Sequence, residues 1–180
     1  GKFDDPSDPA KGIVFDGRVA EDFKLLSGTW VHCGQVRLGA FTACTPVIQD
    51  AVVTGRDREY IGLLVFPNLA ACRAIAGNED LSLAEVAVHP AVCEVLRQGL
   101  ERYNAGHGAN SMRIARATVL IDPPSIDLGE ITDKGYINQR AVTECRADRV
   151  EALYAQQPDP SVLVLCETVR SRGEACAVAA

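Results

Sequence analysis

Residues 130–140 have the sequence Glu-Ile-Thr-Asp-Lys-Gly-Tyr-Ile-Asn-Gln-Arg and lie between a predicted strand and a predicted helix. Lys134 is flanked here by Asp133 and Gly135. Aspartate tolerates turn geometry and glycine supplies a positive φ, so the pattern predicts a turn that holds Lys134 away from the backbone. Catalytic groups often occupy such loops, although a lysine in a polar turn is also an ordinary surface residue. Lys134 is the first candidate for chemistry.

The segments around this stretch show clear periodicity. Residues 114–121 alternate partly and end at Pro123-Pro124, which predicts a strand, and apolar residues at helical spacing predict a helix over 139–156. Upstream, two β-branched and aromatic runs at 47–54 and 60–66 flank a polar loop at 55–59 and predict an antiparallel pair.

The remaining elements complete an α+β domain. Residues 23–31 predict a short hairpin around Ser27-Gly28, and 13–15 a short strand. Helices are expected at 35–44, burying Val36, Phe41 and Cys44, and at 68–77, 81–88 and from Pro90 to the glycine at 106. The expected fold is a small mixed or antiparallel sheet of about three strands plus a short hairpin, covered by about five helices.

Composition excludes several classes of function. The chain has 180 residues, of which 47% are hydrophobic and 23% charged, a balance typical of a globular domain. Its net charge is −6 and it has no basic stripe with interleaved aromatics, so nucleic acid is not an expected partner. It has no apolar run of 18 residues, so no membrane span is expected.

The cysteines and histidines predict no metal site. Seven cysteines are scattered without a Cys-x-x-Cys pair, which is typical of reduced thiols in a cytoplasmic protein. The three histidines add no metal-ligand spacing.

Three segments are expected along the chain. Residues 1–12 are acidic and proline-rich and predict an extended linker, 13–157 form the domain, and 158–180 form a tail with an apolar patch at 162–165. Because the chain begins without a methionine or a signal peptide, we expect that it belongs to a longer protein whose N-terminal domain precedes the linker.

A second stretch, at 15–31, has the sequence Phe-Asp-Gly-Arg-Val-Ala-Glu-Asp-Phe-Lys-Leu-Leu-Ser-Gly-Thr-Trp-Val. Together with residues 129–140 it resembles the C-terminal lid domain of the adenylate-forming acyl-CoA synthetases, most closely the feruloyl-CoA synthase branch. The resemblance extends from about residue 12 to 154.

The resemblance implies roles for individual residues. Lys134 falls on the lysine that enters the active site during adenylation, and Arg18 on an arginine that contacts the nucleotide near its ribose. Ala20 takes the place of the usual hinge aspartate, with Glu21 after it, which departs from the wider family pattern. Without the resemblance, the residues favour the other interpretation of Arg18, a surface arginine that pairs with Asp16 or Glu21.

The resemblance also implies a second half-reaction. After adenylation the lid rotates, withdraws Lys134 and presents Ser27, Gly28 and Thr29 to the thiol of coenzyme A, with Gly28 leaving room for the pantetheine arm. From the residues alone, Gly28 is equally an ordinary turn glycine. Lys24 and Trp30 are candidate site residues, and the alternative for Trp30 is packing in the core or in the hairpin.

The implied function is therefore the lid of a cytoplasmic ATP-dependent acid–thiol ligase that adenylates a ferulate-like hydroxycinnamate and transfers it to coenzyme A. Its partners are the N-terminal domain and a small aromatic carboxylic acid, with Mg²⁺ expected alongside ATP in the full-length enzyme. The isolated chain is expected to be catalytically incomplete. The alternative is a noncatalytic α+β binding or assembly module with the same fold. Whether Glu130 and Asp133 orient Lys134 by charge or only keep the loop soluble stays open.

Overall fold

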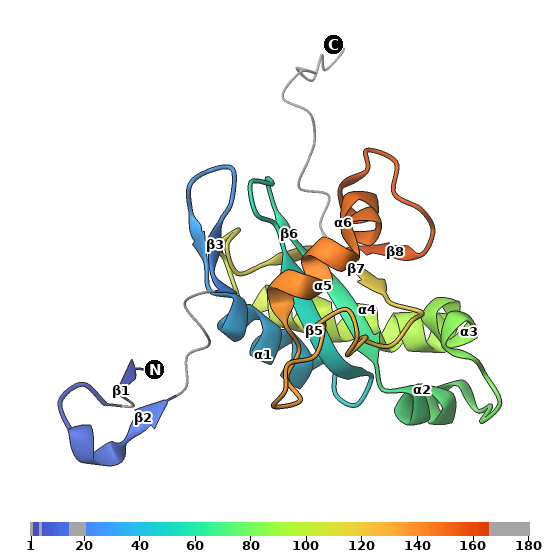
Figure 1. The fold of residues 1–180 in the computed structure, drawn as a ribbon, viewed down its shortest axis with the longest axis horizontal. Coiled ribbons are helices and arrows are strands. Elements are labelled where there is room, and N and C mark those ends of the chain that lie inside the picture. The colour runs from blue at the N-terminus through green and yellow to red at the C-terminus, as the bar shows by residue number, and fades with distance from the viewer. Residues whose placement is uncertain (1, 4, 15–20, 166–180) are drawn as a thin grey trace, which may run out of the picture.

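A four-stranded mixed sheet forms the centre of the computed structural model, which describes residues 2–3, 5–14 and 21–165 (Figure 1). The strand order is β5-β6-β7-β8. The β5–β6 and β7–β8 pairs are antiparallel and the β6–β7 pair is parallel. The strands are β5 (Ile48–Thr54), β6 (Ile61–Pro67), β7 (Ile114–Val119) and β8 (Val162–Val164). The α+β prediction is confirmed.

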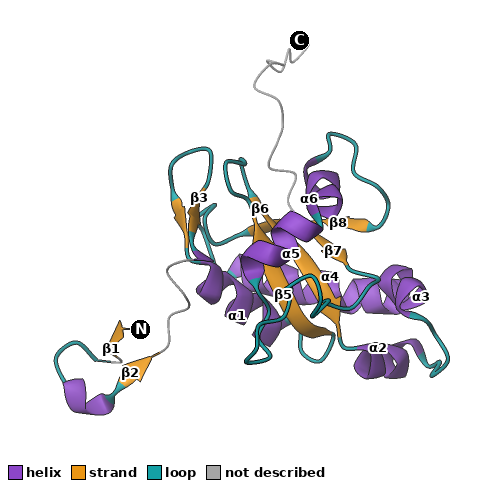
Figure 2. Cartoon of the chain, in the orientation of Figure 1, coloured by secondary structure: helices purple, strands orange, loops and turns teal. Residues whose placement is uncertain are grey.

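Helices cover both faces of the sheet (Figures 1 and 2). Alternate residues of β6 belong to different cores: Leu63 and Val65 pack with one set of helices, and Leu64 and Phe66 with the other. This alternation follows from the two-residue period of a strand. The first face carries α1 (Cys33–Ala43), α2 (Leu69–Ala76), α3 (Leu83–Val88) and α4 (Pro90–Ala105), and the second carries α5 (Gln139–Cys145) and α6 (Ala147–Tyr154).

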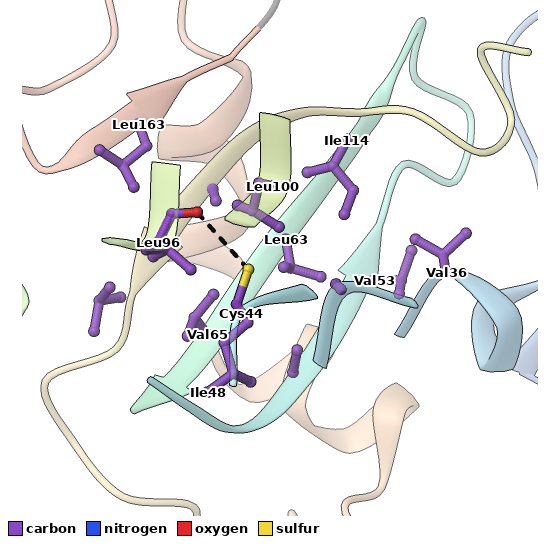
Figure 3. Packing of buried hydrophobic residues seen from close by; sticks show 14 of the residues in the cluster. Val36, Cys44, Ile48, Val53, Leu63, Val65, Leu96, Leu100, Ile114 and Leu163 are labelled. Atoms are coloured by element: carbon purple, nitrogen blue, oxygen red, sulfur yellow. Dashed lines mark hydrogen bonds between the residues drawn. The ribbon is translucent and has the colours of Figure 1, made fainter. Parts of the chain in front are cut away.

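The larger core lies between α1, α4 and the sheet (Figure 3). Leu96 and Leu100 of α4 share this core with Val36 of α1 and Leu63 of β6. The Cys44 thiol donates to the carbonyl oxygen of Leu96 at 3.7 Å. α4 therefore has the amphipathic character that its sequence predicts.

The end of α2 and the start of α3 carry residues suited to those positions. Gly77 adopts the left-handed conformation (φ 69°) and ends α2. Ser82 and Glu85 form a reciprocal capping box at the start of α3. The antiparallel β5–β6 pair is also confirmed, and so is the hairpin formed by β3 (Phe23–Lys24) and β4 (Trp30–Val31).

The fourth strand, β8, corrects the prediction of about three strands. It pairs with β7, with Thr118 opposite Val162 and Arg116 opposite Val164. These residues were predicted to belong to a tail after residue 157, because the short apolar patch at 162–165 follows two prolines and has no periodicity of its own. The pairing with β7 makes this patch a strand.

Two further predictions are wrong in detail. The helix expected over 139–156 is broken into α5 and α6 at Arg146, whose backbone leaves helical geometry (φ −113°, ψ 36°). Phe41 was expected in the core but is 40% exposed, whereas Val36 and Cys44 are buried as predicted.

The N-terminal segment contains local structure instead of being extended throughout. β1 (Lys2–Phe3) pairs with β2 (Ile13–Val14), and a short 3-10 helix, η1 (Pro9–Lys11), lies between them. The Asp8 side chain accepts from the N–H of Ala10 and so caps this helix. The role of residues 1–12 as a linker stays a prediction.

Candidate functional site

Lys134 lies at the exposed tip of a small closed loop, which we call the lysine loop (residues 131–137). An antiparallel bridge joins Ile131 to Ile137. Inside it, the N–H of Thr132 donates to the carbonyl of Tyr136 at 2.8 Å, and the N–H of Gly135 donates to the carbonyl of Thr132 at 2.9 Å. Gly135 has a φ of 78°, which confirms the predicted turn. Within the described part of the chain, the Lys134 ammonium has no hydrogen-bond or ion-pair partner.

The residue before the lysine loop is anchored by a buried ion pair. Glu130 is 1% exposed, and its carboxylate accepts two hydrogen bonds from Arg146, from Nε at 2.7 Å and from Nη2 at 2.8 Å. It also accepts from the N–H of Ser125 at 2.7 Å. Hydrogen bonding to Arg146 lowers the pKa of Glu130, so the carboxylate is ionised at neutral pH. Sequence reasoning left the role of Glu130 open and did not single out Arg146, which is distant in sequence.

The residues after the lysine loop are anchored to the sheet. Asn138 caps α5 by accepting from the N–H of Ala141 at 3.3 Å. Gln139 is buried, and its side-chain amide bonds to both backbone polar groups of Val53 on β5. The lysine loop therefore projects from two fixed ends.

The β3–β4 hairpin presents Ser27, Gly28 and Thr29 at its tip. Gly28 has a φ of 80°, and the space where a Cβ would lie is open. The Ser27 and Thr29 hydroxyls are 3.0 Å apart. The tip thus offers two hydroxyls beside a residue without a side chain.

Trp30 follows this tip and is not a core residue. It is 54% exposed, and the Lys24 ammonium lies 5.1 Å from the centre of its ring. Packing of Trp30 in the core is therefore excluded, which leaves hairpin packing or a role in the site.

The predicted hinge is described only in part. Arg18 and Ala20 lie outside the described residues. The Glu21 carbonyl accepts from the Cys33 thiol at 3.1 Å, and Asp22 accepts from the N–H of Cys33 at 3.0 Å. Burial, followed by the nearby Asp22 carboxylate, raises the pKa of the Cys33 thiol to about 12. These contacts fix the chain directly after the hinge to the start of α1.

A groove of about 520 Å³ lies beside Glu21. It joins Glu21 of the predicted hinge to the start of α5, two regions more than 110 residues apart in sequence that were not predicted to lie together. The groove is lined by Glu21, Phe23, Val53, Thr54, Gly55, Arg56, Gln139, Arg140, Thr143 and Glu144.

The lysine loop and the β3–β4 hairpin are well separated. In Figure 1 the orange loop before α5 and the blue hairpin tip project in opposite directions from the sheet. The structure therefore does not bring Lys134 together with Ser27, Gly28 and Thr29 in one site.

The described residues hold neither a cluster of metal-binding side chains nor a membrane-spanning helix. Residues 2–3, 5–14 and 21–165 contain no group of three or more His, Cys, Asp or Glu side chains that could hold a metal ion. No helix among them is long and apolar enough to cross a membrane.

The fold and the lysine loop agree with a known class of domain. Residues 37–158 match the family described as "AMP-binding enzyme C-terminal domain", and the chain belongs to this family. No curated protein sequence matches the chain significantly.

Solved structures with a similar fold are adenylation domains of carboxylic acid reductases. The A domain of the enzyme from Segniliparus rugosus, in complex with AMP and a co-purified carboxylic acid, has a TM-score of 0.58 and 24% sequence identity, over 79% of this chain and 21% of that chain. The adenylation domain of the enzyme from Mycobacterium chelonae has a TM-score of 0.59 and 21% identity, over 78% and 20%. This chain thus spans about a fifth of the length of these proteins, and at such identities the likeness shows the fold alone.

Proposed function

We propose that this chain is the C-terminal lid domain of an ATP-dependent acid–thiol ligase, in which Lys134 enters the active site to assist adenylation of a carboxylic acid. The observation that carries the proposal is the exposed Lys134 ammonium at the tip of a loop whose two ends are anchored. Membership of the AMP-binding family supports the reaction class.

The chemistry explains why a lysine suits this place. A carboxylate oxygen attacks the α-phosphorus of ATP, a new P–O bond forms, and the bond to the pyrophosphate leaving group breaks. Negative charge from both reactants gathers as the transition state forms, and an ammonium on a flexible stem can contact both sets of oxygens. Lys134 has no ion-pair partner within the described residues, so no internal ion pair has to break before its ammonium contacts the reactants.

The second half-reaction is assigned to the hairpin tip. We propose that Ser27, Gly28 and Thr29 line the passage for the pantetheine arm of coenzyme A, and that Arg18 contacts the nucleotide, with the hinge at Ala20 and Glu21. The hairpin tip and the lysine loop project in opposite directions, so they cannot face the same active site at the same time (Figure 1). This separation supports two orientations of the lid, one for each half-reaction. The choice of a hydroxycinnamate such as ferulate rests on sequence resemblance to the feruloyl-CoA synthase branch.

The test uses the full-length enzyme and separates the half-reactions. Lys134→Ala is compared with wild type in ferulate-dependent pyrophosphate release and in thioester formation from supplied feruloyl-adenylate. We expect pyrophosphate release to fall by about 100-fold or more, as for loss of a group that stabilises transition-state charge, while thioester formation persists. Lys11→Ala is the matched control, because Lys11 is an exposed lysine that pairs with Asp5 at 2.8 Å.

Other outcomes would redirect the assignment. If Lys134→Ala changes neither half-reaction, Lys134 is a surface residue and the noncatalytic binding or assembly module becomes the better proposal. If benzoate or a fatty acid supports faster pyrophosphate release than ferulate, the substrate assignment is wrong although the lid role stands.

A further inference from the structure

We infer that Glu130 and Arg146 are positioning residues for Lys134: their buried ion pair sets where the lysine loop points during adenylation. This inference rests on the proposed function. Neither residue contacts substrate in it, and both act through the loop.

The Arg146 guanidinium ties three segments together. Besides its two bonds to Glu130, it donates to the carbonyl oxygens of Asp122 and Pro123 at 3.0 and 2.8 Å. It also lies 5.2 Å from the centre of the Phe66 ring on β6. The segment after β7, the start of the lysine loop and the α5–α6 junction therefore converge on one side chain.

The break between α5 and α6 falls at Arg146. Its non-helical backbone (φ −113°, ψ 36°) interrupts what the sequence predicts to be one helix. This interruption coincides with the side chain's four hydrogen bonds to Glu130, Asp122 and Pro123. The residue at which the helix is interrupted is thus the residue whose side chain forms the hydrogen-bond network at the base of the lysine loop.

The pair is coupled directly to the lysine loop through the backbone. The N–H of Asn138 donates to the Glu130 carbonyl at 2.8 Å, which closes the base of the loop one residue outside the Ile131–Ile137 bridge. A rotation of Glu130 would move both ends of this base and swing the tip that carries Lys134. A shift of about 1 Å in a positioned group costs on the order of 100-fold in rate.

The buried Glu130–Arg146 ion pair is suited to hold the base of the lysine loop in one conformation. Glu130 is 1% exposed and the Arg146 side chain 13% exposed, so removing either partner leaves a charge without its counterpart in a poorly solvated place. A planar guanidinium also fixes the direction of the carboxylate through two parallel bonds, which a lysine cannot do.

The domain contains a matched control for this pair. Arg37 donates to both oxygens of Asp50, at 2.8 and 2.7 Å, and this pair joins α1 to β5 instead of holding the lysine loop. Asp50→Asn removes a paired carboxylate with the same hydrogen-bonding geometry. If Asp50→Asn and Glu130→Gln change a rate to the same extent, that change reflects a general loss of stability of the domain.

The experiment measures wild type, Glu130→Gln, Arg146→Lys, Asp50→Asn and Lys134→Ala in the full-length enzyme. Pyrophosphate release, thioester formation from supplied adenylate, and amide hydrogen exchange over 131–138 are followed for each. We expect Glu130→Gln and Arg146→Lys to lower kcat of pyrophosphate release by about 10- to 100-fold, with the KM for ATP little changed and thioester formation retained. Exchange at Thr132, Gly135 and Asn138 should quicken in these two variants and not in Asp50→Asn.

The outcomes separate this inference from the proposed function. If Lys134→Ala abolishes pyrophosphate release while Glu130→Gln and Arg146→Lys behave as Asp50→Asn, the positioning role is overturned and the lid function stands. If Glu130→Gln lowers both half-reactions equally and in step with its unfolding midpoint, the pair is merely structural, which also overturns the inference. If Lys134→Ala leaves pyrophosphate release intact, the proposed function fails and the positioning role fails with it.

Discussion

The side chain of Gln139 closes the free edge of the main sheet at Val53. Its amide oxygen accepts from the N–H of Val53 at 3.1 Å, and its amide nitrogen donates to the carbonyl of the same residue. β5 is paired on one side only, with β6, so these two backbone groups have no strand partner on the other. Gln139 thus replaces a missing strand at one point and attaches the start of α5 to the sheet.

Gln139→Leu is expected to destabilise the domain strongly. The change leaves two backbone polar groups unpaired beside an apolar side chain, and each costs about 1–3 kcal/mol. We expect the free energy of unfolding to fall by about 2–4 kcal/mol, measured by urea denaturation. Gln98→Leu is the control, since Gln98 is exposed on α4 and bonds only to Glu94 among the described residues. Equal losses in both variants would contradict the role of Gln139.

Gly99→Ala is expected to separate α1 from α4. A Cβ at Gly99 would lie 2.6 Å from the Cys44 sulfur and 2.8 Å from the Ala43 carbonyl oxygen, and a backbone atom cannot move aside cheaply. We expect a loss of about 1–3 kcal/mol by urea denaturation, typical of overpacking. At Gly106 the nearest atom, the Tyr103 carbonyl oxygen, is 3.6 Å away, so Gly106→Ala should be close to neutral. A neutral Gly99→Ala would mean that the two helices are not packed this closely.

The Glu130–Arg146 pair predicts a specific loss of stability in acid. Because hydrogen bonding to Arg146 lowers the pKa of Glu130 from its ordinary 4.5, folding favours the ionised carboxylate. The contribution is fully present above about pH 4.5, the unfolded value, and is lost as the pH falls through the lower folded pKa.

The difference in unfolding free energy between wild type and Glu130→Gln isolates this effect. We expect wild type to be more stable at pH 7 and its advantage to shrink steadily below about pH 4.5. An advantage that grows in acid would contradict the sign of the pKa shift.

A chain that ends at residue 157 should be less stable than one that ends at residue 165. The shorter chain loses β8, with the buried side chains of Val162 and Leu163, and uncovers the edge of β7. It also loses the hydrogen bond from Arg97 to the carbonyl of Val164 at 3.1 Å. Thermal unfolding should therefore occur at a lower temperature in the shorter chain.

Sedimentation of the same two chains gives an independent readout. Exposed strand edges pair with other chains, so we expect self-association of the chain ending at 157 and a monomer for the chain ending at 165. If the two chains unfold and sediment alike, β8 contributes little and the domain effectively ends at residue 157.

Local signals in the sequence were sufficient for most elements. The β-branched and aromatic runs at 47–54 and 60–66 predicted β5 and β6, and the helical spacing of Val92, Leu96 and Leu100 predicted α4, because these patterns reflect burial directly. The turn around Lys134 was predicted for the same kind of reason: Gly135 adopts a positive φ that few other residues tolerate.

Elements that depend on distant partners were missed. β8 is a strand because β7 offers it an edge, and Phe41 is exposed because α1 turns that side outward, neither of which the local sequence encodes. The break between α5 and α6 falls at Arg146, whose side chain bonds to Glu130, 16 residues earlier, and to two carbonyl groups further upstream.

The sequence by itself determined the class of fold, the periodic elements and the candidate lysine, since each follows from residue types at short spacing. Only the tertiary structure decided how that lysine is held. Glu130 meets Arg146, and Gln139 meets Val53 across 86 residues of chain, because burial brings polar groups together that must then satisfy one another. Such pairings depend on three-dimensional packing and leave no periodic trace in the sequence.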